Sequence, residues 1–171
     1  MKVLVVEDDI IIAMTISDML KEAGHSVIGP VSTAGAALEW AWADLPDFAL
    51  INIDLADEHK GTDLARTLLR ELGVGSYFVS GNLSAAKEAA DASLGYISKP
   101  FSQKTLRESL DVAQELMNGA GLKSRKLPDG LVLFQPSAGT APSERRCAPC
   151  PRQDADGATS GQKDHPGPDS R

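Results

Sequence analysis

Acidic side chains follow two short apolar runs in the first third of the chain. Glu7 and Asp8 come directly after Val3–Val6, and Asp54 comes shortly after Phe48–Ile51. Carboxylates gathered at one place repel each other unless a cation joins them, and Mg²⁺ is a hard cation that takes one or two carboxylates and keeps several waters. These residues therefore predict an Mg²⁺ site held by Glu7, Asp8 and Asp54.

A hydroxyl and an ammonium group stand at the ends of two later apolar runs. Ser80 follows Ser76–Val79, and Lys99 follows Gly95–Ser98. A hydroxyl can donate a hydrogen bond to a phosphoryl oxygen, and an ammonium group can balance phosphoryl charge or pair with the acids. Together with the carboxylates, these two side chains predict a site for phosphoryl transfer.

The pattern of apolar residues over 1–118 predicts five strands that alternate with five helices. The run at 48–51 is apolar throughout, so this strand is expected to be buried on both faces. The alternation is typical of a doubly wound α/β fold, with a five-stranded parallel sheet, helices on both faces and the flavodoxin-like strand order 2-1-3-4-5. We expect strands over 3–6, 25–30, 48–51, 76–79 and 95–98, and helices over 12–23, 33–42, 62–72, 84–92 and 102–118.

This strand order predicts one crevice for the polar residues. Strands one and three are neighbours at the point where the strand order reverses, which is where ligands bind in such sheets. The acids and Asn52 are thus expected to meet there, with the hydroxyl and ammonium groups at adjoining strand ends. A flavin phosphate binder has the same architecture, but it needs a Gly/Ser/Thr-rich loop after the first strand. Residues 7–9 are acidic instead of Gly, Ser or Thr. Their negative charges would disfavour a bound flavin phosphate unless a metal ion were also present.

These motifs, in this order and at this spacing, resemble the receiver domain of the two-component response-regulator family. The stretch Val3–Asp8 matches the acidic pair that holds Mg²⁺, Ser80 matches the hydroxyl of the fourth strand, and Lys99–Phe101 matches the lysine and its cis-proline turn. Tyr96 falls where the family has an aromatic switch residue. The resemblance covers residues 1–118, about two thirds of the chain.

One position departs from the family pattern. The phosphoacceptor aspartate normally follows the apolar part of the third strand directly, and Asn52 stands there, with Leu55 and Gly61 at the positions expected beyond it. A neutral amide is a poor nucleophile, so Asn52 cannot form the acyl phosphate that a carboxylate forms. Asp54 would point to the same side about 6 to 7 Å further along a continuing strand. It is therefore the alternative acceptor and a further candidate ligand for the metal.

Charge and composition divide the chain near residue 120. The whole chain has 171 residues and a net charge of -7, and an acidic protein of this kind is not expected to bind nucleic acid. No apolar run reaches the roughly 18 residues of a membrane span, and no signal peptide is recognisable, so we expect a cytoplasmic protein. Residues 1–119 are predicted to form the receiver domain, and the Pro/Gly/Ser-rich residues 120–171 to form a disordered tail.

Several features remain open beside this interpretation. Leu131–Phe134 is the apolar patch of the tail and is either a short strand or a docking peptide. Trp40 and Trp42 are two residues apart, so we expect one in the core and one on the surface. Cys147 and Cys150 have the spacing of a redox or half-zinc motif, but no second cysteine pair and no helix start accompany them.

The resemblance, together with the lack of a helix-turn-helix pattern or a basic patch after Leu122, predicts a stand-alone receiver protein without enzymatic activity of its own. Such a protein would dock to a sensor histidine kinase or a phosphotransfer protein of a phosphorelay, here with a degenerate phosphoacceptor. The alternative is a pseudo-receiver that serves as an interaction module independently of phosphorylation. A third class, a redox or zinc protein, would rest on the two cysteines.

Overall fold

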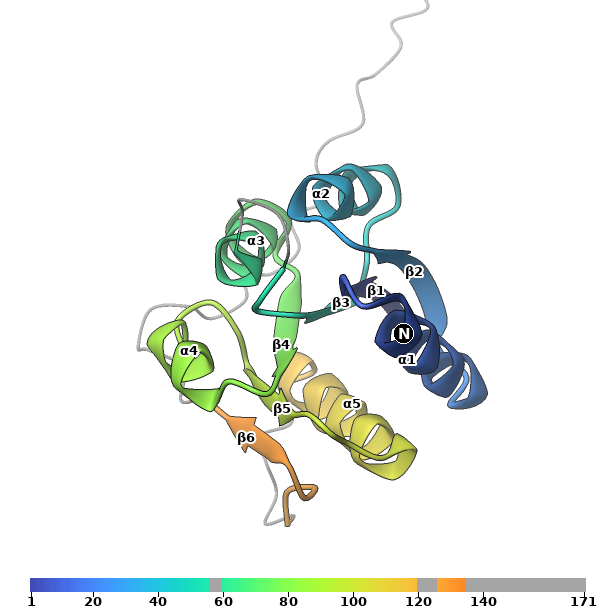
Figure 1. The fold of residues 1–171 in the computed structure, drawn as a ribbon, viewed down its shortest axis with the longest axis vertical. Helices are drawn as coiled ribbons and strands as arrows, with labels where there is room; N and C mark the ends of the chain where they lie inside the picture. The colour runs from blue at the N-terminus through green and yellow to red at the C-terminus, as the bar shows by residue number, and fades with distance from the viewer. Residues whose placement is uncertain (56–59, 120–125, 135–171) are drawn as a thin grey trace, which may run out of the picture.

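A six-stranded sheet forms the middle of the molecule in a computed structural model that describes residues 1–55, 60–119 and 126–134 (Figure 1). The strand order is β2-β1-β3-β4-β5-β6, so the predicted order 2-1-3-4-5 is confirmed for the five parallel strands. The strands are β1 (Lys2–Val6), β2 (Ser26–Val31), β3 (Phe48–Ile51), β4 (Gly75–Ser80), β5 (Gly95–Ser98) and β6 (Leu131–Leu133).

Helices cover both faces of the sheet, as the doubly wound fold requires (Figure 1). α1 and α5 pack on one face and α2, α3 and α4 on the other, and each layer has its own cluster of buried apolar side chains. The helices are α1 (Ile10–Glu22), α2 (Ala34–Ala43), α3 (Gly61–Thr67) with a π-helical turn, η1 (Leu68–Leu72), α4 (Leu83–Glu88) and α5 (Gln103–Met117).

Polar side chains fix where the helices begin. Thr33 accepts a hydrogen bond from the N–H of Ala36, and Ser102 accepts one from the N–H of Thr105. Each satisfies one of the four N–H groups that a helix start leaves without an internal partner. Both caps agree with the helix starts predicted from the sequence.

The central strand is buried as predicted. All four residues of β3 are at most 1% exposed, and β3 lies between β1 and β4 in the sheet. Its register pairs Val6 of β1 with Ile51, so the next residue of each strand, Glu7 and Asn52, emerges at the same edge. The pairing of β1 with β3 therefore places Glu7 and Asn52 side by side at this edge of the sheet.

The sixth strand corrects the expected count of five. β6 pairs antiparallel with β5, so Leu131–Leu133 forms a short strand of the sheet, which is one of the two alternatives left open for this apolar segment. The predicted domain boundary at residue 119 stays a prediction, and so does disorder in 120–125 and 135–171, since these residues lie outside the described part. Cys147 and Cys150 also lie there.

Both tryptophans lie at the surface of α2. Trp40 and Trp42 are 50% and 61% exposed, so the expectation that one of them lies in the core is wrong.

Within the described residues, no helix combines the length and the apolar character needed to cross a membrane.

Candidate functional site

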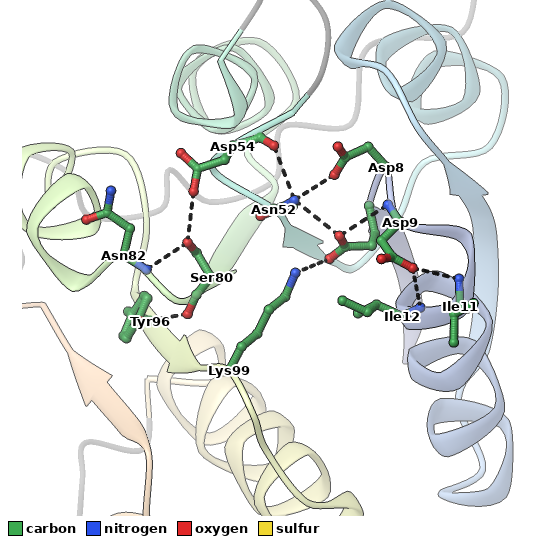
Figure 2. A network of polar contacts seen from close by, with 11 residues as sticks. Asp8, Asp9, Ile11, Ile12, Asn52, Asp54, Ser80, Asn82, Tyr96 and Lys99 are labelled. Carbon is green, nitrogen blue, oxygen red and sulfur yellow. Dashed lines mark hydrogen bonds and ion pairs between the residues drawn. The ribbon is translucent and has the colours of Figure 1, made fainter.

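The ends of β1 and β3 bring an acid and an amide together inside the protein (Figure 2). The backbone N–H of Asn52 donates to the carbonyl of Val6 at 2.8 Å, which continues the pairing of the two strands by one residue. Glu7 is 3% exposed and Asn52 is 8% exposed. Both side chains are thus held in a poorly hydrated place, where an unpaired charge is costly.

The amide of Asn52 fills the space between the acidic side chains. Its Nδ2 donates to Glu7 Oε1 at 3.1 Å and to Asp8 Oδ1 at 2.7 Å, and it lies 3.4 Å from the carbonyl oxygen of Asp54 (Figure 2). A neutral N–H₂ group therefore bridges two carboxylates that would otherwise repel each other. An aspartate at this position would offer two acceptors and no donor.

Lys99 completes the pairing of Glu7. Lys99 Nζ lies 2.6 Å from Glu7 Oε2, and the side chains of the two residues are 19% and 2% exposed. Burial raises the pKa of Glu7 above its ordinary value of 4.5, while the hydrogen bond and the positive charge of Lys99 act in the opposite direction. One carboxylate oxygen of Glu7 thus accepts from an ammonium group and the other from an amide.

Asp54 turns toward the end of β4. Ser80 Oγ donates to Asp54 Oδ2 at 3.3 Å and accepts a hydrogen bond from the N–H of Asn82 at 3.0 Å (Figure 2). Ser80 is buried, whereas Asp54 is exposed to solvent. The structure therefore brings Asp54 and Ser80 together, as a phosphoryl site would need, but directs the Asp54 carboxylate away from the other two acids.

The predicted set of three metal ligands is not assembled. In residues 1–55, 60–119 and 126–134, no group of three His, Cys, Asp or Glu side chains could hold a metal ion. Glu7 and Asp8 remain as a pair, and both already accept from Asn52. As arranged, the side chains do not fit a resident Mg²⁺ held by three carboxylates, and Mg²⁺ binding stays a prediction that rests on the acidic pair.

Tyr96 lies buried behind the site. Its hydroxyl donates to the carbonyl of Ser80 at 2.6 Å. Three residues further along the chain, Lys99 begins the predicted turn, with a cis Lys99–Pro100 peptide bond. The structure thus couples β5 to the end of β4 at the residue predicted as a switch. The switching role itself stays a prediction.

Sequence reasoning missed two residues of the site. Asp9 caps α1 by accepting from the N–H groups of Ile11 and Ile12, and its own N–H lies 3.5 Å from Glu7 Oε1. Asn82 caps α4 and also binds Ser80 through its N–H. An Asp or Asn directly before a helix is a capping signal, so both could have been found from the positions of the helix starts.

Gly61 shapes the backbone under Asn52, and a substitution there should be costly. A Cβ at Gly61 would lie 2.0 Å from the carbonyl oxygen of Asn52, which nothing flexible can relieve. We expect Gly61→Ala to lower the free energy of unfolding by about 1–3 kcal/mol, measured by urea unfolding. Gly35→Ala is the matched control, since a Cβ there meets nothing within 4 Å and should leave stability equal or higher. Equal stability of the two variants would contradict the prediction.

Comparison with known proteins gives one consistent answer. A family model for the "Response regulator receiver domain" matches residues 3–111. The chain is 26% identical over 116 residues to the "Transcriptional regulatory protein PdtaR" of Mycobacterium tuberculosis, covering 66% of this chain and 56% of that protein. It is 32% identical over 80 residues to the "Phyllosphere-induced regulator PhyR" of Methylorubrum extorquens, covering 46% of this chain and 30% of that one. The chain thus spans little more than half of the first relative and less than a third of the second.

A solved structure agrees with these sequence matches. The signal receiver domain of a modulated diguanylate cyclase from Desulfovibrio desulfuricans is similar, with a TM-score of 0.60 and 28% identity over 66% of this chain and 91% of that one.

Proposed function

Because the chain belongs to the response regulator receiver domain family, we propose that it acts in two-component signalling as a docking module whose interaction does not depend on phosphorylation at Asn52. Its partner in this proposal is a sensor histidine kinase or a histidine phosphotransfer protein. The observation that carries the proposal is the bridging amide, because Asn52 occupies the acceptor position with a donor group and offers no nucleophile. The protein would then act by binding, without an activity of its own.

The α1 side of the crevice supports docking at this face. Ile10, Ile11 and Met14 are 64%, 73% and 57% exposed, which is unusual for large apolar side chains grouped on one helix. Figure 2 shows α1 starting beside the acidic cluster, so a partner on this helix would also cover the crevice. A shallow groove continues the surface from α1 to the turn before α5, and its lining residues are Ile12, Thr15, Ile16, Met19, Lys99, Pro100 and Phe101.

Phosphorylation of Asp54 is the second candidate, and one observation favours it. The carboxylate of Asp54 is exposed and receives a hydrogen bond from Ser80, the hydroxyl that the family resemblance assigns to the phosphoryl group. Acetyl phosphate with Mg²⁺, followed by intact-mass measurement, separates the candidates. A phosphoryl adduct on the wild type that Asp54→Asn abolishes would establish the second candidate, and an unmodified chain would support the first.

Docking can be tested with Met14 as the probe position. We expect Met14→Glu to weaken binding to a purified histidine phosphotransfer domain at least about tenfold, measured by biolayer interferometry on a panel of such domains. The reason is that a charge at the middle of an apolar contact must be desolvated without a partner. Trp42→Glu is the matched control, because Trp42 is equally exposed but lies on α2. Equal loss in both variants, or binding by no member of the panel, would contradict the proposal.

A further inference from the structure

The edge of β5 is paired with a segment that comes from far along the chain. β6 runs antiparallel to β5, with Tyr96 opposite Val132. The N–H of Ser98 donates to the carbonyl of Gly130 at 2.9 Å, and the N–H of Phe134 donates to the carbonyl of Leu94 at 3.0 Å. Thus backbone hydrogen bonds hold both ends of this short segment. Without it β5 would be an open sheet edge, which is a template for another strand.

Gly95 is fitted to this close approach. A Cβ at Gly95 would lie 2.5 Å from the carbonyl oxygen of Val132 and 3.2 Å from a methyl carbon of Leu133. No positive φ requires a glycine at this position. The closest contact is the one to β6, and a ring carbon of Tyr77 on β4, 3.2 Å from the same Cβ position, limits the space from the other side. A backbone that must come this close to another strand is one of the uses of glycine within sheets.

The side chains of the segment reach both layers of the core. Leu131 is 5% exposed, and Leu131 and Leu133 pack with the cluster beneath α1 and α5. Phe134 packs with the opposite cluster beneath α2, α3 and α4, while Val132 is 37% exposed. The segment therefore combines main-chain pairing with apolar contacts on two sides, which is how extended peptides are recognised when they add a strand to a sheet.

We propose that the β5 edge is a binding site for an extended apolar peptide, that Leu131–Phe134 is its resident occupant, and that a partner segment with the same apolar-x-apolar-aromatic pattern binds there when the resident leaves. An occupant tethered to its own site competes at a millimolar effective concentration. A free peptide should consequently bind poorly to the intact chain and well to a chain whose resident segment is displaced. This site is separate from the exposed apolar surface of α1. A failed test of the proposed docking function would therefore not contradict the peptide site, and the reverse also holds.

The test uses a fluorescein-labelled peptide of residues 126–134 and the full chain, with binding followed by anisotropy. The double variant L131D/L133D should displace the resident segment, because two charges cannot be buried in the apolar cluster without partners. We expect the peptide to bind this variant at least about tenfold more tightly than the wild type, in line with the loss of the tethered competitor. A peptide carrying the same two aspartates should not bind.

Gly95 provides the specificity control. Adding Gly95→Ala to the displaced variant should abolish binding, because the new methyl group would take the place of the peptide carbonyl. Adding Gly35→Ala, where a Cβ meets nothing within 4 Å, should leave binding unchanged. The proposal would be overturned if Gly95→Ala left peptide binding unchanged. It would also be overturned if L131D/L133D folded but bound no peptide.

A second variant keeps the proposal testable if L131D/L133D does not fold. Val132→Pro changes an exposed side chain and removes a backbone donor from the strand, which weakens pairing without touching the core. The same peptide should bind this variant more tightly than the wild type. Equal affinities, with the chain folded by circular dichroism, would again overturn the proposal.

Discussion

Replacing Asn52 by aspartate is expected to destabilise the metal-free protein by about 2–4 kcal/mol and to make its stability depend on Mg²⁺. The substitution removes the amide that donates to Glu7 and Asp8 at 3.1 and 2.7 Å, and it places a third carboxylate at the same point. Two lost hydrogen bonds to charged groups and new like-charge repulsion both act against the folded state. A divalent cation would relieve the repulsion by binding the carboxylates together.

Urea unfolding with EDTA or Mg²⁺, together with calorimetry, measures this effect. Asn52→Asp should gain stability with Mg²⁺ and bind it more tightly than the wild type, and with acetyl phosphate it should take up a phosphoryl group at position 52. Asn52→Ala is the control, because it loses the same amide but adds no third carboxylate, and so should gain less stability from Mg²⁺ than Asn52→Asp does. If the wild type and Asn52→Asp bind Mg²⁺ equally, the amide does not occupy the cation position.

The arrangement of strands could be predicted because it depends on short-range patterns. Each apolar run marked a strand, and parallel strands with crossover helices leave few possible orders. The neighbouring positions of Glu7 and Asn52 follow from that order, since both are the first polar residues after β1 and β3. The residues of the crevice could thus be named without knowing any side-chain conformation.

The directions of the side chains could not be predicted in the same way. Asp54 binds Ser80 rather than the acidic pair, and the amide of Asn52 presents its nitrogen to Glu7. Both choices depend on rotamers that many partners select together, and no local pattern encodes them. The predicted ligand set was chosen from the positions of the carboxylates in the sequence, and these positions do not specify where each side chain points.

The two tryptophans show how a periodic pattern can be misread. Their separation by two residues places them about 200° apart around a helix, which suggested one buried and one exposed ring. The buried stripe of α2 consists of Ala34, Ala37 and Ala41. Each tryptophan then lies about 100° from the middle of this stripe, one on either side, so neither reaches the core. The small alanines, and not the large rings, mark the inner face.

The sixth strand lay beyond the reach of local patterns for a different reason. Leu131–Leu133 pairs with Gly95–Ile97, which is more than thirty residues away in the sequence. The apolar pattern allowed a strand, but nothing in it specified the partner. Gly95 was the one local hint, because a Cβ there would lie 2.5 Å from the carbonyl oxygen of Val132, but a glycine within a strand does not identify the segment that approaches it.

Lys99→Met is expected to lower the free energy of unfolding by about 3 kcal/mol near neutral pH, because it leaves the buried carboxylate of Glu7 without a counter-charge. In the described part of the chain, Lys99 is the one basic group in an ion pair with Glu7. Methionine keeps most of the side-chain volume, so the change isolates the charge. The estimate stays at the lower end for a buried pair, since Lys99 is 19% exposed and water reaches its ammonium group.

The effect should depend on pH in a defined direction. Burial already raises the pKa of Glu7 above 4.5, and removing Lys99 takes away the group that opposes this shift. A carboxyl with a raised pKa binds more protons in the folded state than in the unfolded state, so its destabilising effect is absent below pH 4.5 and grows as the pH rises through the raised pKa. Urea unfolding in EDTA between pH 4.5 and 8 should therefore show the variant approaching the wild type in acid and falling away from it with increasing pH. Adding Glu7→Gln should remove this divergence, because no carboxyl then remains to ionise, whereas a constant difference at every pH would mean that Lys99 stabilises the fold through its packing and not through the charge of Glu7.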